Sequence, residues 1–202
     1  MSNILILDFI SYSPYENLAA EEIFCNMCAC IGVRGIFLWQ NKDTVVIGQN
    51  QNPWRECRLS EMEREGVKLA RRKTGGGAVF HDLGNLNFSF CAPRELYDQE
   101  LNYKIIVDAV RKAGIPAEIN GRNDITAGGR KFSGNAFRHT QSYSLAHGTL
   151  LISSDLSRLS SYLTPSEDKL KGKGTLSRVA CNKPIGAFAS DKRQNAEKIR
   201  RK

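Results

Sequence analysis

Residues 71–81, Arg-Arg-Lys-Thr-Gly-Gly-Gly-Ala-Val-Phe-His, join two arginines to three consecutive glycines. Glycine costs about 0.5–1 kcal/mol relative to alanine inside a helix or strand, so this run is poor material for regular structure. A glycine turn instead leaves its N–H groups open to an anion, and guanidinium groups beside it bind phosphate or carboxylate. The alternative is an ordinary glycine hairpin between two strands. The adjacent Arg71 and Arg72 favour an anion-binding site.

A second basic, glycine-rich segment spans residues 121–136, where Gly-Arg-Asn-Asp is followed after three residues by Gly-Gly-Arg-Lys-Phe-Ser-Gly-Asn-Ala. An acid before a glycine turn and a lysine after it place Asp124 and Lys131 near each other across a hairpin. Ser133 and Gly134 are small for a strand, which is typical where a ligand lies against the backbone. The alternative is a surface hairpin whose lysine discourages edge pairing.

The elements around these segments predict an α+β fold with a mixed or antiparallel β-sheet flanked by helices, because most strands follow one another without crossover helices. Ser13 and Pro14 predict a helix start, and Gly114 is expected to end a second long helix. Residues 41–43 are expected to form a hairpin turn. The expected strands are Ile4–Phe9, Gly35–Gln40, Thr44–Gly48, Val67–Lys73, Ala78–Asp82, Leu86–Cys91, Ala117–Asn120, Asp124–Thr126, Lys131–Phe137 and Ser142–Leu151; the expected helices are Tyr15–Cys30, Leu59–Glu65, Gln99–Ala113 and Asp155–Leu163.

The 202 residues carry a formal net charge of +8, of which residues 191–202 supply four (six Lys or Arg against two acids). This balance favours an acidic protein partner or a phosphorylated ligand over nucleic acid.

No apolar run approaches the roughly 18 residues of a membrane span, and the N-terminus lacks a secretory pattern. We expect no membrane association and a cytoplasmic location, or a mitochondrial one if the source is eukaryotic.

The chain has six cysteines, three of them at positions 25, 28 and 30. This trio continues the pattern of the first predicted helix, and no second Cys or His pair lies near it in the sequence. Free thiols in a reducing compartment are therefore expected in preference to structural zinc.

Several motifs, in order along the chain, resemble the lipoate–protein ligase family of the biotin/lipoyl protein ligase superfamily. The resemblance runs from about Tyr12 to Val179 and implies a catalytic domain similar to class II aminoacyl-tRNA synthetases and biotin synthetase. It predicts a catalytic domain over residues 1–180 and a loosely ordered basic tail over 181–202. The motifs are Tyr12–Ala19, Val46–Trp54, Arg71–Asn85, Gly121–Asp124, Arg130–Gly134, His147–Leu151 and Ser177–Val179.

The resemblance implies a two-step reaction that uses ATP and Mg²⁺. Lipoate and ATP form lipoyl-AMP, and the lipoyl group then passes to a lysine of a lipoyl-domain protein, such as an E2 subunit or the glycine cleavage H protein. Lys131 matches the family lysine and is the predicted catalytic residue, because a fixed cation stabilises charge as the mixed anhydride reacts. Asp124 is predicted either to orient Lys131 or to bind the Mg²⁺ ion.

Other site residues follow from the same resemblance. Trp39, Val46 and Ile47 are expected to wall the dithiolane tail, although core packing explains them equally well. The predicted nucleotide-binding residues are Arg72, Gly77, Ala78, Val79, Phe80 and Lys131. The predicted substrate-binding residues are Arg72, Gly75, Gly76, His81, Asn85, Asp124, Lys131, Ser133, Gly134 and His147. For His81 and His147, a hydrogen-bonded structural role is an equal alternative.

Family ligases usually carry a smaller C-terminal domain, whose pattern is not recognisable after residue 181, so its absence is expected. One alternative is therefore a lipoyltransferase that uses preformed lipoyl-AMP or a separate accessory subunit. A second alternative is a non-catalytic protein that binds lipoate or lipoyl-AMP. Octanoyltransfer through an acyl-cysteine is disfavoured because no cysteine lies in residues 117–124. Acceptor preference, lipoate against octanoate, and oligomeric state are left open.

Overall fold

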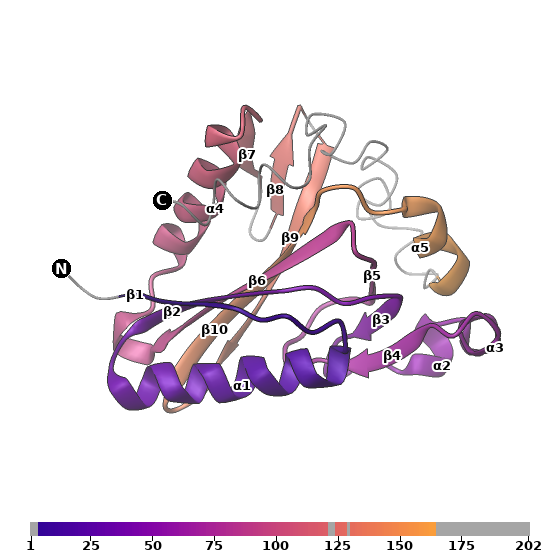
Figure 1. Ribbon diagram of the computed structural model, residues 1–202, viewed down its shortest axis with the longest axis horizontal. Coiled ribbons are helices and arrows are strands. Elements are labelled where there is room, and N and C mark those ends of the chain that lie inside the picture. The colour runs from indigo at the N-terminus through magenta and orange to yellow at the C-terminus, as the bar shows by residue number, and fades with distance from the viewer. Residues whose placement is uncertain (1–3, 121–123, 129, 165–202) are drawn as a thin grey trace.

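The computed structural model describes residues 4–120, 124–128 and 130–164. Seven strands form one sheet in the order β1-β2-β6-β10-β9-β8-β7, and three form a second sheet in the order β4-β3-β5 (Figure 1). The elements are β1 (Ile4–Asp8), α1 (Pro14–Ile31), β2 (Arg34–Trp39), β3 (Thr44–Ile47), α2 (Pro53–Glu56), α3 (Leu59–Arg64), β4 (Lys68–Arg71), β5 (Val79–His81), β6 (Asn85–Pro93), the 3₁₀ turn η1 (Arg94–Leu96), α4 (Gln99–Lys112), β7 (Ala117–Asn120), β8 (Asp124–Ala127), β9 (Arg130–His139), β10 (Tyr143–Leu151) and α5 (Leu156–Tyr162).

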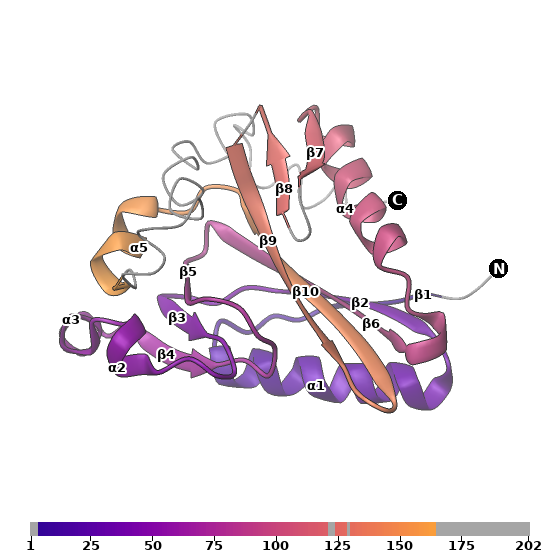
Figure 2. The same cartoon turned by 180° about the vertical axis from the view of Figure 1, so that it is seen from behind.

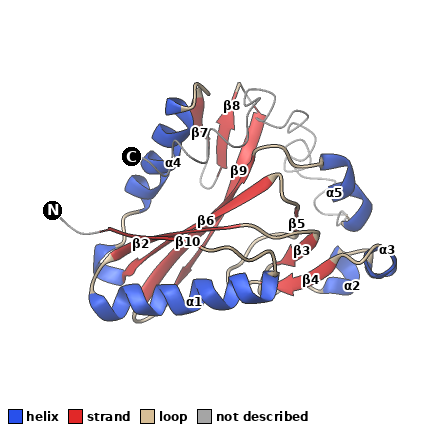
Figure 3. Ribbon diagram, viewed as in Figure 1, coloured by secondary structure: helices blue, strands red, loops and turns tan. Residues whose placement is uncertain are grey.

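The expected α+β class, with a mixed sheet flanked by helices, is confirmed. β1 pairs with β2, and β3 with β4, in parallel; the other strand pairs are antiparallel. Figure 2 shows β9 and β10 side by side across the large sheet, and Figure 3 shows α1 and α4 beside its strands. No helix within the described residues is long and apolar enough to cross a bilayer.

The two long helices cover opposite faces of the large sheet. Phe37 packs in the cluster beneath α1, whereas its strand neighbours Ile36 and Leu38 contact the cluster beneath α4. Successive strand residues point to opposite faces, so this alternation assigns one helix to each side. Gly35 permits the close approach of α1, because a Cβ there would lie 2.4 Å from Cys28 Sγ.

The predicted first helix, Tyr15–Cys30, agrees with α1 to within one residue at each end. α1 begins with Pro14 after Ser13, where a missing backbone N–H removes no helical hydrogen bond. It ends at Gly32, whose φ of 71° is the left-handed conformation that glycine adopts readily. The Val33 N–H then donates to the Cys28 carbonyl at 3.0 Å and closes the helix end.

The predicted hairpin at residues 41–43 is wrong. β2 pairs with β1 and β6 in the large sheet, whereas β3 pairs with β4 and β5 in the small one, so the segment crosses between sheets. The physical reason is Asn41, which is fully buried and hydrogen-bonded to Asn17 and His81 instead of facing solvent in a turn.

The expectation of free thiols is wrong for two cysteines. Cys25 on α1 and Cys91 on β6 form a disulfide that joins positions 66 residues apart. Sequence spacing did not reveal this pair because the helix–sheet packing, not local sequence, brings the two residues together. Cys28, Cys30 and Cys57 are free.

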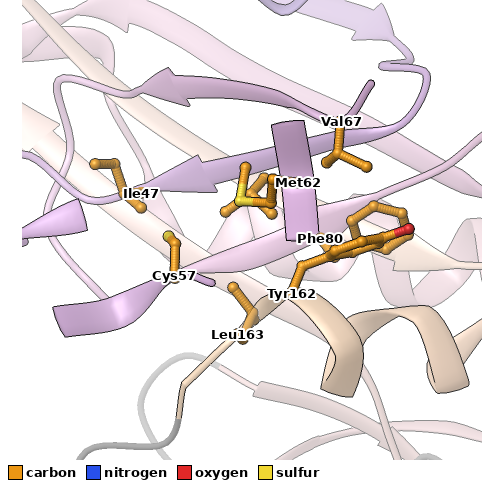
Figure 4. Close-up of a cluster of buried hydrophobic side chains, with 9 residues drawn as sticks. Ile47, Cys57, Met62, Val67, Phe80, Tyr162 and Leu163 are labelled. Carbon is orange, nitrogen blue, oxygen red and sulfur yellow. The ribbon is translucent and has the colours of Figure 1, made fainter. Parts of the chain in front are cut away.

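A third apolar cluster anchors the small sheet to α5 (Figure 4). The Phe80 and Tyr162 rings lie with centroids 5.1 Å apart, and the Arg158 guanidinium lies 5.1 Å from the centre of the Phe80 ring. This packing holds β5 beneath the cavity described next. The predicted tail, residues 181–202, and the predicted Gly121-Arg122-Asn123 motif lie outside the described residues.

Candidate functional site

A cavity of about 370 Å³ lies between the small sheet and the β9–β10 side of the large sheet. All of the residues predicted to bind nucleotide or substrate, except Gly75, line it. They are Arg72, Gly76, Gly77, Ala78, Val79, Phe80, His81, Asn85, Asp124, Lys131, Ser133, Gly134 and His147. The tertiary structure therefore brings the two glycine-rich segments to one space, while the chemical roles of the residues remain predictions.

Lys131 and Asp124 form an ion pair at one wall of the cavity, with Nζ and Oδ1 2.7 Å apart. The expected proximity of these two groups across the β8–β9 hairpin is thus confirmed. Both side chains are about one third exposed, so the pair remains accessible to a ligand. A Cβ at Gly134 would lie 3.4 Å from Lys131 Cε, which shows that the lysine stem passes directly over this glycine.

Arg72 holds the glycine loop, residues 74–78, through backbone carbonyls. Its Nη2 donates to the Gly75 and Gly77 carbonyls at 2.7 and 2.8 Å, and its Nη1 donates to the Val46 carbonyl at 3.2 Å. Between these two glycines, Gly76 has a φ of 92°, which side-chain-bearing residues rarely adopt. Burial lowers the Arg72 pKa to about 10, and the Glu21 charge opposes this change. The guanidinium therefore stays charged at neutral pH and clamps the loop.

Arg71 clamps the neighbouring segment instead of pointing into the cavity. Its Nη1 lies 3.1, 3.0 and 2.7 Å from the carbonyl oxygens of Gly48, Gln49 and Gln51. The two arginines thus stabilise adjacent turns, and Arg72, which the resemblance singled out, is the one that lines the cavity.

His81 lines the cavity, and one nitrogen of its buried ring has no hydrogen-bond partner among the described residues. Asn17 Nδ2 donates to Asn41 Oδ1 at 2.8 Å, so Asn41 Nδ2 is the group that faces His81 Nδ1 at 3.1 Å and donates to it. The proton of the neutral ring then lies on Nε2, which has no partner among the described residues although the ring is only 3% exposed. Burial, with the Arg72 charge as a further cause, lowers the His81 pKa to about 3.

Three further buried polar atoms of cavity-lining residues lack partners within the described part of the chain: Asn85 Oδ1, Asn87 Nδ2 and Ser133 Oγ. Asn85 Nδ2 donates to Asn87 Oδ1 at 2.9 Å, which fixes both amides in these orientations. Buried polar groups are normally hydrogen-bonded. The unpaired donors and acceptors therefore suit a polar ligand in the cavity.

The apolar side of the cavity includes Leu18, Trp39 and Val46. Trp39 and Val46 were expected there, whereas Ile47 packs into the third core cluster instead. Strand alternation explains the difference, because neighbouring residues of β3 face opposite sides.

Sequence reasoning missed Glu21, Asn41 and Asn87 as residues of this region. Each is a buried polar side chain, and burial of a polar residue has no local sequence signature. Within the described residues, no three His, Cys, Asp or Glu side chains cluster as a metal site. Asp124 nevertheless supplies one carboxylate, which together with substrate phosphates is a usual ligand set for Mg²⁺.

The chain matches a protein-family model, the lipoyl protein ligase A/B catalytic domain, over residues 13–186. It is 50% identical to lipoate-protein ligase A of Psychrobacter cryohalolentis, over 80% of this chain and 48% of that protein. It is 53% identical to lipoate-protein ligase A of Bdellovibrio bacteriovorus, over 81% of this chain and 49% of that protein. The chain thus spans about half the length of these curated relatives.

Solved structures of ligases share the fold. P. falciparum LipL1, solved with lipoate, is 34% identical with a TM-score of 0.74, covering 92% of this chain and 59% of its own. A lipoate-protein ligase A bound with ATP is 26% identical with a TM-score of 0.78, and the match covers 98% of this chain and 81% of that one. An archaeal bi-partite lipoate protein ligase of Thermoplasma acidophilum, described with its E2 lipoyl domain, is 26% identical with a TM-score of 0.78. That match covers 98% of this chain and 79% of the archaeal one. These matches confirm the catalytic-domain fold expected from the sequence.

Proposed function

The chain belongs to the lipoyl protein ligase A/B catalytic-domain family, and we propose that it transfers a lipoyl group to a lysine of a lipoyl-domain protein through lipoyl-AMP. One observation carries the proposal: Lys131, from the later hairpin, lines the same cavity as the glycine loop. Lipoate and ATP are the proposed substrates, since relatives of this chain were solved with each of them.

In the first step, a lipoate carboxylate oxygen attacks the α-phosphorus of ATP, a P–O bond forms and pyrophosphate leaves. In the second, the acceptor amine attacks the lipoyl carbonyl carbon and loses a proton, while the bond to phosphate breaks and AMP leaves. No protein nucleophile is needed. Among the described residues no cysteine lines the cavity, so an acyl-cysteine route lacks support.

Lys131 stabilises both steps electrostatically. A fixed ammonium between the acyl carbonyl and the phosphate offsets the negative charge that develops on them. The glycine loop offers backbone amides from Gly77 to Phe80 for the nucleotide. Asp124 would hold Mg²⁺, which would neutralise phosphate charge when bound. Trp39 and Val46 provide an apolar wall for the dithiolane tail.

The second candidate is a lipoyltransferase that takes preformed lipoyl-AMP or works with a separate accessory subunit. The bi-partite archaeal ligase, which matches 98% of this chain, favours it. The proposed acceptors are the same in both cases, E2 lipoyl domains and the glycine cleavage H protein, and the basic net charge suits acidic partners.

Mass spectrometry of an acceptor lipoyl domain tests the proposals. The purified chain is incubated with acceptor, Mg²⁺ and either lipoate plus ATP or preformed lipoyl-AMP; an acceptor with arginine at its target lysine is the control. Lipoylation from lipoate plus ATP supports the ligase, and lipoylation from lipoyl-AMP alone supports the transferase. Stoichiometric binding of lipoyl-AMP without transfer indicates a non-catalytic binding protein. If the chain neither binds lipoyl-AMP nor transfers a lipoyl group, all three proposals are overturned.

A further inference from the structure

Glu21 of α1 is a carboxylate beneath the cavity, only 5% exposed, and it does not line the cavity. It accepts hydrogen bonds from the Ser89 hydroxyl and from His147 Nδ1, the latter at 2.9 Å. Trp39 Nε1 donates to Ser89 Oγ at 3.0 Å and orients that hydroxyl toward Glu21. A buried charge costs free energy unless it is paired, so these donors fix the carboxylate in one position.

Glu21 in turn orders the groups between α1 and the glycine loop. Because His147 Nδ1–H donates to Glu21, the ring presents the lone pair of Nε2 to Thr74 Oγ1, 2.8 Å away. The Thr74 hydroxyl therefore donates to His147. Its oxygen is then free to accept from Arg72 Nε, 3.0 Å away.

Arg72 is the end of this chain of hydrogen bonds and the clamp of the glycine loop. Its Nη2 binds the carbonyls on both sides of Gly76. The rotation of the guanidinium plane therefore sets the position of these carbonyls, and a hydrogen bond at Nε limits that rotation. Thr74 is 2% exposed and His147 7%, so water competes little for these bonds.

We propose that Glu21 and His147 are positioning residues that, through Thr74 and Arg72, hold the glycine loop in the conformation that lines the cavity. Only the kinetic part of the test rests on the proposed function. Glu21 acts through His147, since it does not itself reach the cavity. His147 does line the cavity, so the decisive variants are made at Thr74 and Glu21.

The Thr74→Val and Thr74→Ser variants form a matched pair. Valine keeps the branched shape without the hydroxyl, whereas serine keeps the hydroxyl. In Thr74→Val, amide hydrogen exchange over residues 75–78 is expected to accelerate about tenfold or more, and KM for lipoate to rise roughly 10- to 100-fold with kcat less affected. This range corresponds to a lost hydrogen bond to a charged group. Thr74→Ser is expected to restore slow exchange.

Glu21→Leu tests the far end of the chain by ¹⁵N spectroscopy of the His147 ring. In the unsubstituted protein the ring proton of His147 is expected on Nδ1 and the lone pair on Nε2. In Glu21→Leu the ring is expected to populate more than this one tautomer, and amide exchange of the glycine loop is expected to accelerate. Glu21→Gln, which retains an acceptor oxygen, is the conservative comparison. In a double variant with Thr74→Val, the effects of Glu21→Leu on the loop are expected to be non-additive, because both act on one path.

Unchanged amide exchange of the glycine loop in a folded Thr74→Val variant would overturn the proposal. A His147 ring protonated on both nitrogens would also overturn it, because Thr74 Oγ1 would then face two donors, His147 Nε2 and Arg72 Nε. If Thr74→Val does not fold, Glu21→Leu decides instead, and loop exchange and ring spectra equal to those of the unsubstituted protein would overturn the proposal. Exchange and spectra are measured on the chain without substrate. A chain that proves unable to lipoylate any acceptor therefore removes the proposed function and leaves the positioning proposal testable.

Discussion

Lys131 Nζ lies 2.7 Å from Asp124 Oδ1, on neighbouring strands that face the glycine loop across the cavity. The carboxylate holds the ammonium in place while leaving about a third of it exposed. In the proposed reaction, the ligand phosphate would meet a cation whose position is already determined, and such preorganisation is what makes an electrostatic group effective in catalysis.

Replacing Lys131 with alanine is expected to lower lipoyl transfer by about 10²–10³-fold, the scale of losing one oxyanion stabiliser. Transfer to purified H protein from lipoyl-AMP is the measurement, and Lys131→Arg serves as the charge-conserving comparison. Near-normal transfer by Lys131→Ala would reject the catalytic assignment.

Asp124→Asn is expected to impair the reaction with lipoate and ATP more than transfer from lipoyl-AMP. The reason is that the carboxylate is proposed to hold Mg²⁺ against the phosphates of ATP, and lipoyl-AMP lacks the β- and γ-phosphates. The two rates are compared over a Mg²⁺ titration. Glu118→Gln, an exposed acid on β7, is the control. Equal losses in both reactions contradict the metal assignment.

Gly48→Ala is expected to lower the free energy of unfolding by about 1–3 kcal/mol, a typical cost of overpacking. A Cβ at Gly48 would lie 2.2 Å from the Gly76 carbonyl oxygen, a backbone atom, so the glycine loop must shift. At Gly75 no atom lies within 4 Å of the added Cβ, so Gly75→Ala is the matched control. Urea denaturation of both variants provides the check, and equal stabilities would show that the loop yields freely.

His81 is expected to make the protein less stable in acid. Its pKa is lowered from 6.5 to about 3 in the folded state. Between these values the unfolded chain binds one more proton than the folded chain, so the free energy of unfolding rises with pH across this window. The free energy of unfolding therefore falls as the pH is lowered, by up to about 1.4 kcal/mol per pH unit. Denaturant titrations between pH 7 and 4 test this, and His81→Gln is expected to show a shallower dependence. If the free energy of unfolding depended on pH equally in His81→Gln and the unsubstituted protein, the role of His81 would be contradicted.

The Cys25–Cys91 disulfide is expected to contribute about 2–4 kcal/mol to stability, because it closes a long loop in the unfolded chain; the two residues are 66 positions apart. Thermal unfolding with and without reductant measures the difference. A Cys25→Ala/Cys91→Ala double variant is expected to show no response to reductant. Cys30→Ala, at an exposed free thiol, is expected to respond like the unsubstituted chain. Intact mass under non-reducing conditions identifies the bridge, and six alkylated thiols would exclude it.

Local sequence sufficed for features whose physical cause is local. The start of α1 at Pro14 depends on the backbone properties of one residue and was predicted, and the predicted last residue, Cys30, lies one residue before the observed end at Ile31. The facing of Asp124 and Lys131 also follows from a short hairpin, in which strand pairing is set by a few intervening residues. The two glycine-rich segments were recognised as parts of one site from their residue types and their order in the chain.

Pairing between distant segments could not be deduced in this way. Residues 41–43 have the composition of a hairpin turn, yet β2 and β3 enter different sheets because Asn41 is buried against Asn17 and His81. Cys25 meets Cys91, and Glu21 meets Ser89 and His147, only because α1 packs across β6 and β10. A carboxylate on a helix has the same local sequence signature whether it faces water or a histidine. Which of the two it meets is decided by long-range packing, and in this protein that packing connects α1 to the glycine loop.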